Sequence, residues 1–441
     1  MATESLKGIL PTAVSFAKLR ASYAIVGNDT DPYATSKGYY MINEGYPVYT
    51  LGGTKINNPY YVFDTNVLPN PDLKPEKQHS IELGADIKFI NNRFGIDITW
   101  YKTNTKNQIL PINTALETGM TDKLINAGNI QNSGFEIALS ATPIESKDLK
   151  WDMTATFTRN KNKIVELAPN VPIFPIEYNG MDAHAYASVG GSYGDIYTDY
   201  AFKRNDKGEK VLNESGAWQR AGVRTKIGSL QPKFLASFST TVQYKSIVLN
   251  VLLDARYGGD ILSATYNYGM ASGAIASSLN GRSEEYGGLA RKLADGRTVY
   301  DGMIPDGVFA AGITKNGQDV GGMSYREAYE KGLVGPIAAH QYYDNLYSWG
   351  TGIREASRFE CSYVAVREIS ISWDIPRKWL QKVYVKNAAF SLVGRNLGYI
   401  YNSLPDNINP DVTSTNRSTQ FVELGGSPLT RSLGFKLNIG F

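Results

Sequence analysis

The last ten residues of the chain, SLGFKLNIGF, alternate strictly between apolar and polar positions. One set holds Leu433, Phe435, Leu437, Ile439 and Phe441, and the residues between them are polar or glycine. A period of two predicts a β-strand with one apolar face. Strands of globular proteins usually have about five or six residues, whereas a membrane-spanning strand needs about nine to eleven. The length favours a membrane strand, although a strand of a soluble sandwich would alternate in the same way.

The same alternation recurs along the whole chain. SIELGADIKF and RFGIDITWY form a predicted hairpin, with Asn91 and Asn92 as a tight two-residue turn. Pairing Phe89 with Phe94 places both apolar sets on the same face of the sheet. Further strands are expected at residues 14–26, 134–142, 150–158, 232–244, 246–257, 363–374 and 386–397. With the last strand, the pattern predicts ten strands.

The connections between these strands alternate between short and long. Transmembrane barrels have short periplasmic turns and long extracellular loops, whereas a soluble sandwich has no reason to keep every long loop at one end. The alternation therefore predicts an all-β fold, an antiparallel transmembrane β-barrel with long extracellular loops. Short links fall near residues 91–92, 144–149, 245 and 376–385, and long ones at about 27–77, 103–133, 162–231, 258–362 and 398–429.

Aromatic residues support this interpretation. From Phe234 to Tyr244 the predicted strand would rise about 25 Å at a tilt of about 40°, which is the height of the apolar band of an outer-membrane barrel. Such barrels carry aromatic girdles at both membrane boundaries, while ordinary core aromatics are the alternative. The predicted girdle beside the short turns comprises Phe89, Phe94, Trp151, Tyr244, Trp373 and Phe441.

One strand, YVAVREISISW, interrupts the alternation. Strict alternation back from Trp373 would place Arg367 on the lipid-facing side, at a cost of about 2 to 4 kcal/mol. A β-bulge at Arg367 and Glu368 would instead turn Val364 and Val366 outward and keep both charges on the polar side. We predict this bulge.

Composition narrows the function. The chain has 441 residues, 42% of them hydrophobic and 12% aromatic, with a formal net charge of +3. It is too apolar for a disordered chain, and its charge offers no case for a nucleic-acid partner. The three histidines have no metal-ligand spacing, and no feature selects a pair of catalytic carboxylates. We therefore predict no enzymatic activity, catalytic residue, metal or cofactor.

Several segments carry a family resemblance. NPDLKPEKQHSIELGADIKF resembles a stretch of TonB-dependent outer-membrane transporters, and VSFAKLRASYAIVGND, NAGNIQNSGFEIAL, YGGDIL, SYVAVREISISWDIP and GRNLGYIYNSLPDNINPDV resemble the SusC/RagA type found in Bacteroidetes. These segments occur in order over nearly the whole chain. The resemblance implies a 22-stranded barrel plugged by an N-terminal domain. Residues 1–441 are then expected to be the C-terminal, incomplete part of the barrel, without plug domain or signal peptide.

The resemblance also implies a function and partners. Such proteins import oligosaccharides or peptides across the cell outer membrane, with energy from the TonB complex acting through the N-terminal part and a SusD-like surface lipoprotein closing the mouth. The barrel-insertion machinery would read Phe435, Ile439 and Phe441 as an assembly signal. Alone, this chain is expected to be a non-transporting fragment. A surface glycan-binding protein and a self-closed small barrel are the alternatives.

The long loops are rich in tyrosine, glycine, asparagine and aspartate, which suit contact with sugars or peptides by stacking and hydrogen bonding. Packing of the loops themselves is the alternative role for such rings. The candidate ligand-binding residues are Tyr193, Tyr197, Tyr200, Tyr342, Tyr343 and Tyr347.

Overall fold

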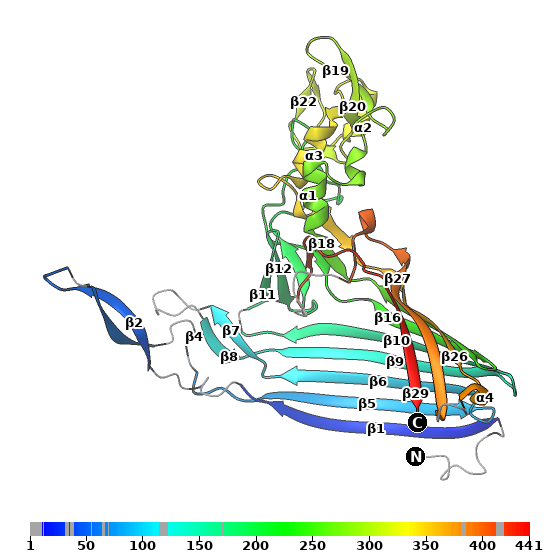
Figure 1. Cartoon of the computed structure of the whole chain (residues 1–441). Helices are drawn as coiled ribbons and strands as arrows, with labels where there is room; N and C mark the ends of the chain where they lie inside the picture. The colour runs from blue at the N-terminus through cyan, green and yellow to red at the C-terminus, as the bar shows by residue number, and fades with distance from the viewer. Residues whose placement is uncertain are drawn as a thin grey trace.

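The computed structural model describes residues 11, 13–30, 35, 39–53, 55–63, 67–68, 70–113, 122–169, 171–380, 385–411 and 419–441 (Figure 1). Among these residues, ten strands pair side by side into one antiparallel sheet, in their order along the chain. The ten predicted strands are thus confirmed. They are β1 (Val14–Asn28), β5 (Glu76–Phe89), β6 (Phe94–Lys106), β9 (Asn129–Glu145), β10 (Leu149–Glu166), β16 (Phe234–Tyr244), β17 (Ile247–Tyr257), β26 (Tyr363–Asp374), β27 (Asn387–Asn402) and β29 (Ser432–Gly440).

The first predicted hairpin has the expected register but a different turn. Phe89 of β5 lies opposite Phe94 of β6, as predicted. The prediction of a two-residue turn is wrong, because four residues, 90–93, connect these strands. Ile90, Asn91 and Asn92 have positive φ angles of 49°, 53° and 65°. Asparagine tolerates this left-handed conformation, so Asn91 and Asn92 suit the four-residue turn as well as a two-residue one.

One face of the sheet is apolar and exposed. Leu83 of β5, the second strand, is 50% exposed, and Leu433 of the edge strand β29 is 81% exposed. Between these residues, side chains of the other strands repeat the pattern, for example Leu139 of β9 and Ile371 of β26. Exposed apolar surface that extends across a whole sheet indicates contact with another apolar phase or molecule.

The sheet is open in the part of the chain that the structure describes. β1 is the first strand of the sheet and β29 the last, and the two do not pair with each other. The alternative of a self-closed ten-stranded barrel is therefore not the arrangement that this chain adopts. Each of the two edges presents backbone groups that a neighbouring strand could pair with.

The long connections carry most of the remaining regular structure. They contain three helices, α1 (Ala264–Ser272), α2 (Tyr325–Glu330) and α3 (Ala339–Tyr347), and a four-stranded sheet of β11 (Ile173–Gly180), β12 (Ala183–Ser188), β13 (Asp195–Thr198) and β15 (Thr225–Ser229). The smaller strands of this region are β14 (Val211–Leu212), β18 (Asp260–Ser263), β19 (Leu289–Lys292), β20 (Thr298–Met303), β21 (Val308–Phe309), β22 (Thr314–Lys315), β23 (Gln318–Asp319), β24 (Ile337–Ala338), β25 (Arg358–Glu360) and β28 (Val422–Glu423). Short 3-10 turns occur at Ala276–Leu279, Arg354–Ser357 and Pro405–Asn407.

Two of these connections, residues 195–231 and 258–362, together form what we call the loop domain, which rises from the sheet (Figure 1). Its hydrophobic core joins Phe202 and Trp218 of the first segment to Phe309, Tyr343 and Ile353 of the second. The large buried core of the described residues therefore lies in the loops, whereas the apolar face of the sheet is exposed.

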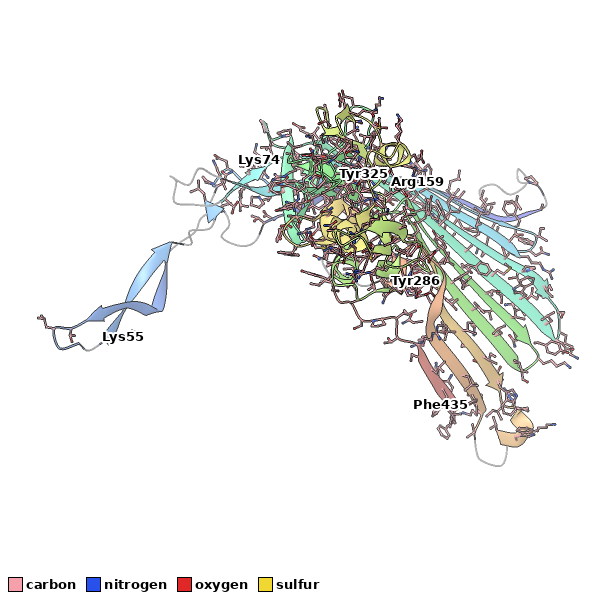
Figure 2. The ribbon with its side chains drawn as sticks, turned by 90° about the horizontal axis from the view of Figure 1, so that it is seen from above. Lys55, Lys74, Arg159, Tyr286, Tyr325 and Phe435 are labelled. Carbon is pink, nitrogen blue, oxygen red and sulfur yellow. The ribbon has the colours of Figure 1, made fainter. Side chains whose placement is uncertain are left out.

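The remaining elements lie at the two ends of the sheet. A hairpin of β2 (Tyr39–Tyr49) and β3 (Lys55–Phe63) extends away from the rest of the molecule, with Lys55 near its tip (Figure 2). Three short strands, β4 (Val67–Leu68), β7 (Ile109–Asn113) and β8 (Asp122–Asn126), pair with one another at the long-loop end, and helix α4 (Arg377–Leu380) lies in a short link. No helix among the described residues has the length and apolarity needed to cross a membrane.

Candidate functional site

The face of the sheet opposite the apolar one, here called the polar face, carries ion pairs that cross several strands. Arg20 of β1 reaches over β5 to Asp97 of β6, with contacts of 2.9 and 2.5 Å, and it also donates to Thr99 at 2.9 Å. Gly84 lies beneath the guanidinium, and a Cβ atom there would come within 2.8 Å of it. Because Gly84 has no side chain, Arg20 can lie flat against β5 and connect three strands of the sheet.

A second long side chain crosses the polar face in the same way. Tyr101 of β6 passes over Gly134 of β9 and donates to Asn160 of β10 at 3.1 Å. Asn160 and Asn162 in turn both donate to Asn132, at 3.2 and 2.9 Å. This face therefore offers amide and hydroxyl groups, which suit hydrogen bonding to polar solutes.

The predicted bulge in β26 is confirmed. Leu252 of β17 pairs with Glu368 and the next residue, Leu253, pairs with Val366, so Arg367 has no partner in this ladder. Its guanidinium donates to Asp254 at 2.8 and 3.0 Å. Because Asp254 belongs to the polar set of β17, Arg367 lies on the polar face. The bulge thus avoids the cost of placing the charged arginine in lipid.

The same arginine fastens the last long connection to the sheet. Arg367 forms an ion pair with Asp411, and its Nη2 atom lies 3.0 Å from the Asp411 Oδ1 atom. Tyr399 of β27 also donates to Asp411, at 3.1 Å. Burial opposes ionisation of Asp411, but the hydrogen bonds and positive charge of Arg367, together with hydrogen bonds from Tyr399 and Tyr363, outweigh it and lower the pKa of this carboxyl. The ionised side chain of Asp411 thus holds residues 403–411 against the polar face of the sheet.

Three of the six candidate ligand-binding tyrosines lie on α3. Tyr343, 4% exposed, and Tyr347 are part of the hydrophobic core of the loop domain. Burial raises the pKa of Tyr343 to about 12, and its hydroxyl donates to the Asn280 carbonyl at 2.7 Å. Tyr342 packs edge-on against Trp218, with ring centres 5.0 Å apart, and lines a cavity.

The other three candidates also contact the protein. Tyr193 packs partly buried against the small core near β10, and Tyr197 donates to Ser188 at 3.2 Å. The Arg220 guanidinium lies 4.1 Å from the centre of the Tyr200 ring. All six rings therefore have packing roles, and ligand contact by any of them remains a prediction.

Sequence reasoning missed one aromatic pair that is more exposed. The rings of Tyr268 on α1 and Trp349 after α3 stack at 5.7 Å with an interplanar angle of 12°. Both are about half exposed, and the Arg354 guanidinium lies 4.9 Å from the Trp349 ring centre. No periodic pattern marks these positions, because the two rings meet only when the loop folds.

The predicted girdle residues lie at the short-turn end of the sheet. Phe89 lies opposite Phe94, and Trp373 lies opposite Ile247, which pairs with Tyr244. Trp151 donates its indole N–H to Thr240 at 2.8 Å. At the opposite end of β16, Phe234 stacks on Tyr257 with ring centres 5.1 Å apart. The register thus agrees with two aromatic rows, and their position at membrane boundaries remains a prediction.

The predicted assembly signal lies on the last strand. Phe435 and Ile439 are exposed on the apolar face of β29, and Phe441 follows the strand and is also exposed. Phe435 stacks on Phe390 of β27 with ring centres 6.2 Å apart. Recognition of these residues during assembly remains a prediction.

Comparisons with known proteins agree with this architecture. A family model described as "TonB dependent receptor-like, beta-barrel" matches residues 15–273. TonB-dependent receptor P3 of Formosa agariphila is 24% identical over 96% of this chain and 39% of its own length. TonB-dependent receptor SusC of Bacteroides thetaiotaomicron is 34% identical over 40% of this chain and 16% of its own length.

Solved structures show the same fold. The RagAB peptide importer in its "closed-closed" state superposes with a TM-score of 0.67 at 15% identity, over 100% of this chain and 42% of that chain. The structure titled "RagAB peptide transporter" gives a TM-score of 0.64 at 16% identity, over 99% of this chain and 42% of that chain. The chain therefore spans about two fifths of the length of these relatives.

Proposed function

Because this chain belongs to the TonB-dependent receptor β-barrel family, whose members are outer-membrane receptors and transporters, we propose that it forms the last ten strands of a nutrient importer. The full-length protein would take up oligosaccharides or peptides and draw energy from the TonB complex through parts that precede these strands. A SusD-like surface lipoprotein would cover its mouth. On this proposal the ten strands alone do not transport.

The observation that carries the proposal is the contrast between the two faces of the sheet. The apolar face is exposed from Leu19 of β1 to Leu433 of β29, which suits lipid. The polar face holds its charges in pairs, as between Arg20 and Asp97 and between Arg367 and Asp254, which suits a wall around a water-filled lumen. Two open edges, β1 and β29, leave room for the remaining strands of a larger barrel.

Different relatives suggest different substrates, peptides in one case and oligosaccharides in the other. One similar structure is titled a peptide importer, and one similar sequence is named SusC. The loop domain offers exposed aromatic rings at Tyr268 and Trp349, on which either a sugar ring or a peptide side chain could stack. Both substrate classes therefore belong in the test.

Uptake by cells tests the proposal. A strain lacking the full-length gene would be supplied with labelled oligosaccharides and labelled oligopeptides, with and without a protonophore that removes the energy source. We expect energy-dependent accumulation of one class, restored by the gene on a plasmid, and co-purification of a surface lipoprotein. Glycan binding at the cell surface without accumulation would favour the alternative of a surface glycan-binding protein. Hydrolysis of the glycan that disappears when a single carboxylate is mutated would favour an enzyme.

A further inference from the structure

A cavity of about 370 Å³ opens in the loop domain. Its lining comes from both segments of the domain: Phe202, Lys210 and Trp218 from the first, and Asp306 and Tyr342 from the second. This volume lies at the lower end of the range for small-molecule sites. The cavity therefore exists only because the two loops fold together.

Each cation that lines this cavity is paired with a carboxylate, two of which also line it. Arg204 forms a two-pronged ion pair with Glu355, with contacts of 3.0 and 2.7 Å. Lys210 lies 3.0 Å from Asp306, and Arg358 donates to Asp260 at 2.7 Å. Since each cation already has a carboxylate partner, an ionic ligand would have to break a pair, whereas a neutral ligand would not.

Aromatic rings form one side of the cavity. Trp218 is fixed because its indole N–H donates to the Asp306 carbonyl at 2.8 Å. The Tyr342 ring stands at 88° to the Trp218 ring, and the Lys210 ammonium lies 4.7 Å from the centre of the Phe202 ring. Phe202 and Trp218 are only 7% and 6% exposed, so Tyr342 supplies the more accessible ring, beside charged hydrogen-bonding groups.

Two polar groups in the lining lack partners among the residues that the structure describes. The Nε atom of Arg358 is buried without an acceptor, and the Tyr342 hydroxyl, which is not among the buried unpaired atoms, makes no hydrogen bond to the described residues. Most buried polar atoms in native proteins are hydrogen-bonded, to protein or to water. Asp306 is also open to a ligand, since its side chain is 83% exposed.

We propose that this cavity binds a neutral saccharide unit. A sugar hydroxyl both donates and accepts, so neighbouring hydroxyls can donate to Asp306 and accept from Lys210 or Tyr342 without disturbing the charge balance. The apolar face of the sugar ring would pack against the partly exposed ring of Tyr342. The inference rests on the proposed function and narrows its substrate class to neutral oligosaccharides. It also places a site that captures the substrate in the loops.

Binding to the purified full-length protein in detergent tests the site. The probes are a printed array of neutral, uronate-bearing and sulfated oligosaccharides together with short peptides, followed by titration of the neutral oligosaccharide that is best retained. We expect Tyr342→Phe and Asp306→Asn each to weaken its binding about three- to tenfold, because the first removes a hydrogen bond and the second replaces a charged acceptor by a weaker neutral one. Tyr300→Phe and Asp295→Asn, which change a tyrosine and an aspartate outside the cavity, should leave binding unchanged.

Two results would overturn the site. One is an array that retains only anionic saccharides or peptides, or nothing. The other is unchanged affinity in both Tyr342→Phe and Asp306→Asn. Thermal unfolding of each variant, compared with the wild type, shows whether a loss of binding reflects misfolding. Neither result touches the proposed function, because energy-dependent uptake by cells is measured separately and could occur through the lumen without this cavity.

Discussion

Replacing Arg367 by alanine should release the last long connection from the wall of the sheet. The arginine holds Asp254 of β17 and Asp411 of the connection at the same time. Its removal leaves two carboxylates close to each other without their shared cation. Because the bulge keeps Arg367 out of both neighbouring ladders, the substitution takes away these contacts while leaving the pairing of the strands intact.

The magnitude follows from burial. Breaking a fully buried ion pair costs about 3 to 5 kcal/mol, and breaking an exposed one about 0 to 1 kcal/mol. The side chains of Arg367 and Asp411 are 23% and 28% exposed, so we expect about 2 to 3 kcal/mol for local opening of residues 403–411. At 1.4 kcal/mol per factor of ten, hydrogen exchange in this segment should be about 30- to 140-fold faster.

Hydrogen–deuterium exchange of the full-length protein, read by mass spectrometry on peptides covering residues 403–411, measures this effect. Arg395→Ala is the matched control, because Arg395 pairs with Glu368 at 2.9 Å on the same face but is 66% exposed, so its loss should change exchange by less than about fivefold. Asp411→Asn provides a second variant should Arg367→Ala fail to assemble. Equal protection in Arg367→Ala and Arg395→Ala would refute the anchoring role.

Three further predictions concern the ends of the sheet and the loop domain. Phe441→Ala should lower the amount of full-length protein in the outer membrane far more than its thermal stability, since lipid burial of one ring contributes only about 2 to 3 kcal/mol; equal loss of abundance in the exposed control Leu437→Ala would contradict recognition. Protease added to intact cells should cleave within residues 258–362, and cleavage at the turn of residues 90–93 instead would reverse the orientation. Tyr343 has a folded pKa of about 12, above its ordinary value of 10, so its contribution to the stability of the loop domain is present below pH 10 and is lost as the pH rises towards 12. Near-ultraviolet circular dichroism between pH 9 and 12 should show this loss, with a shallower slope in Tyr343→Phe; an unchanged slope would show that other groups control it.

The sequence by itself determined the strands of the sheet and the faces of their side chains. Alternation with a period of two is a local property, because neighbouring side chains of a strand must point to opposite faces whatever the strand pairs with. The pairing of Phe89 with Phe94 and the bulge at Arg367 were therefore predictable. The bulge followed from the cost of a charge in lipid alone. The length of the first turn did not follow, because Asn91 and Asn92 suit a four-residue turn as well as a two-residue one.

Only the tertiary structure decided what the long connections do. Residues 195–231 and 258–362 have no common period, and their shared core depends on contacts between residues far apart in the chain, such as Trp218 and Tyr342. Tyrosine content suggested ligand contact but could not separate the buried Tyr343 from the exposed Tyr268, because burial depends on which surfaces meet. The cavity beside Lys210 and its balanced ion pairs have the same origin, since distant parts of the chain supply each partner.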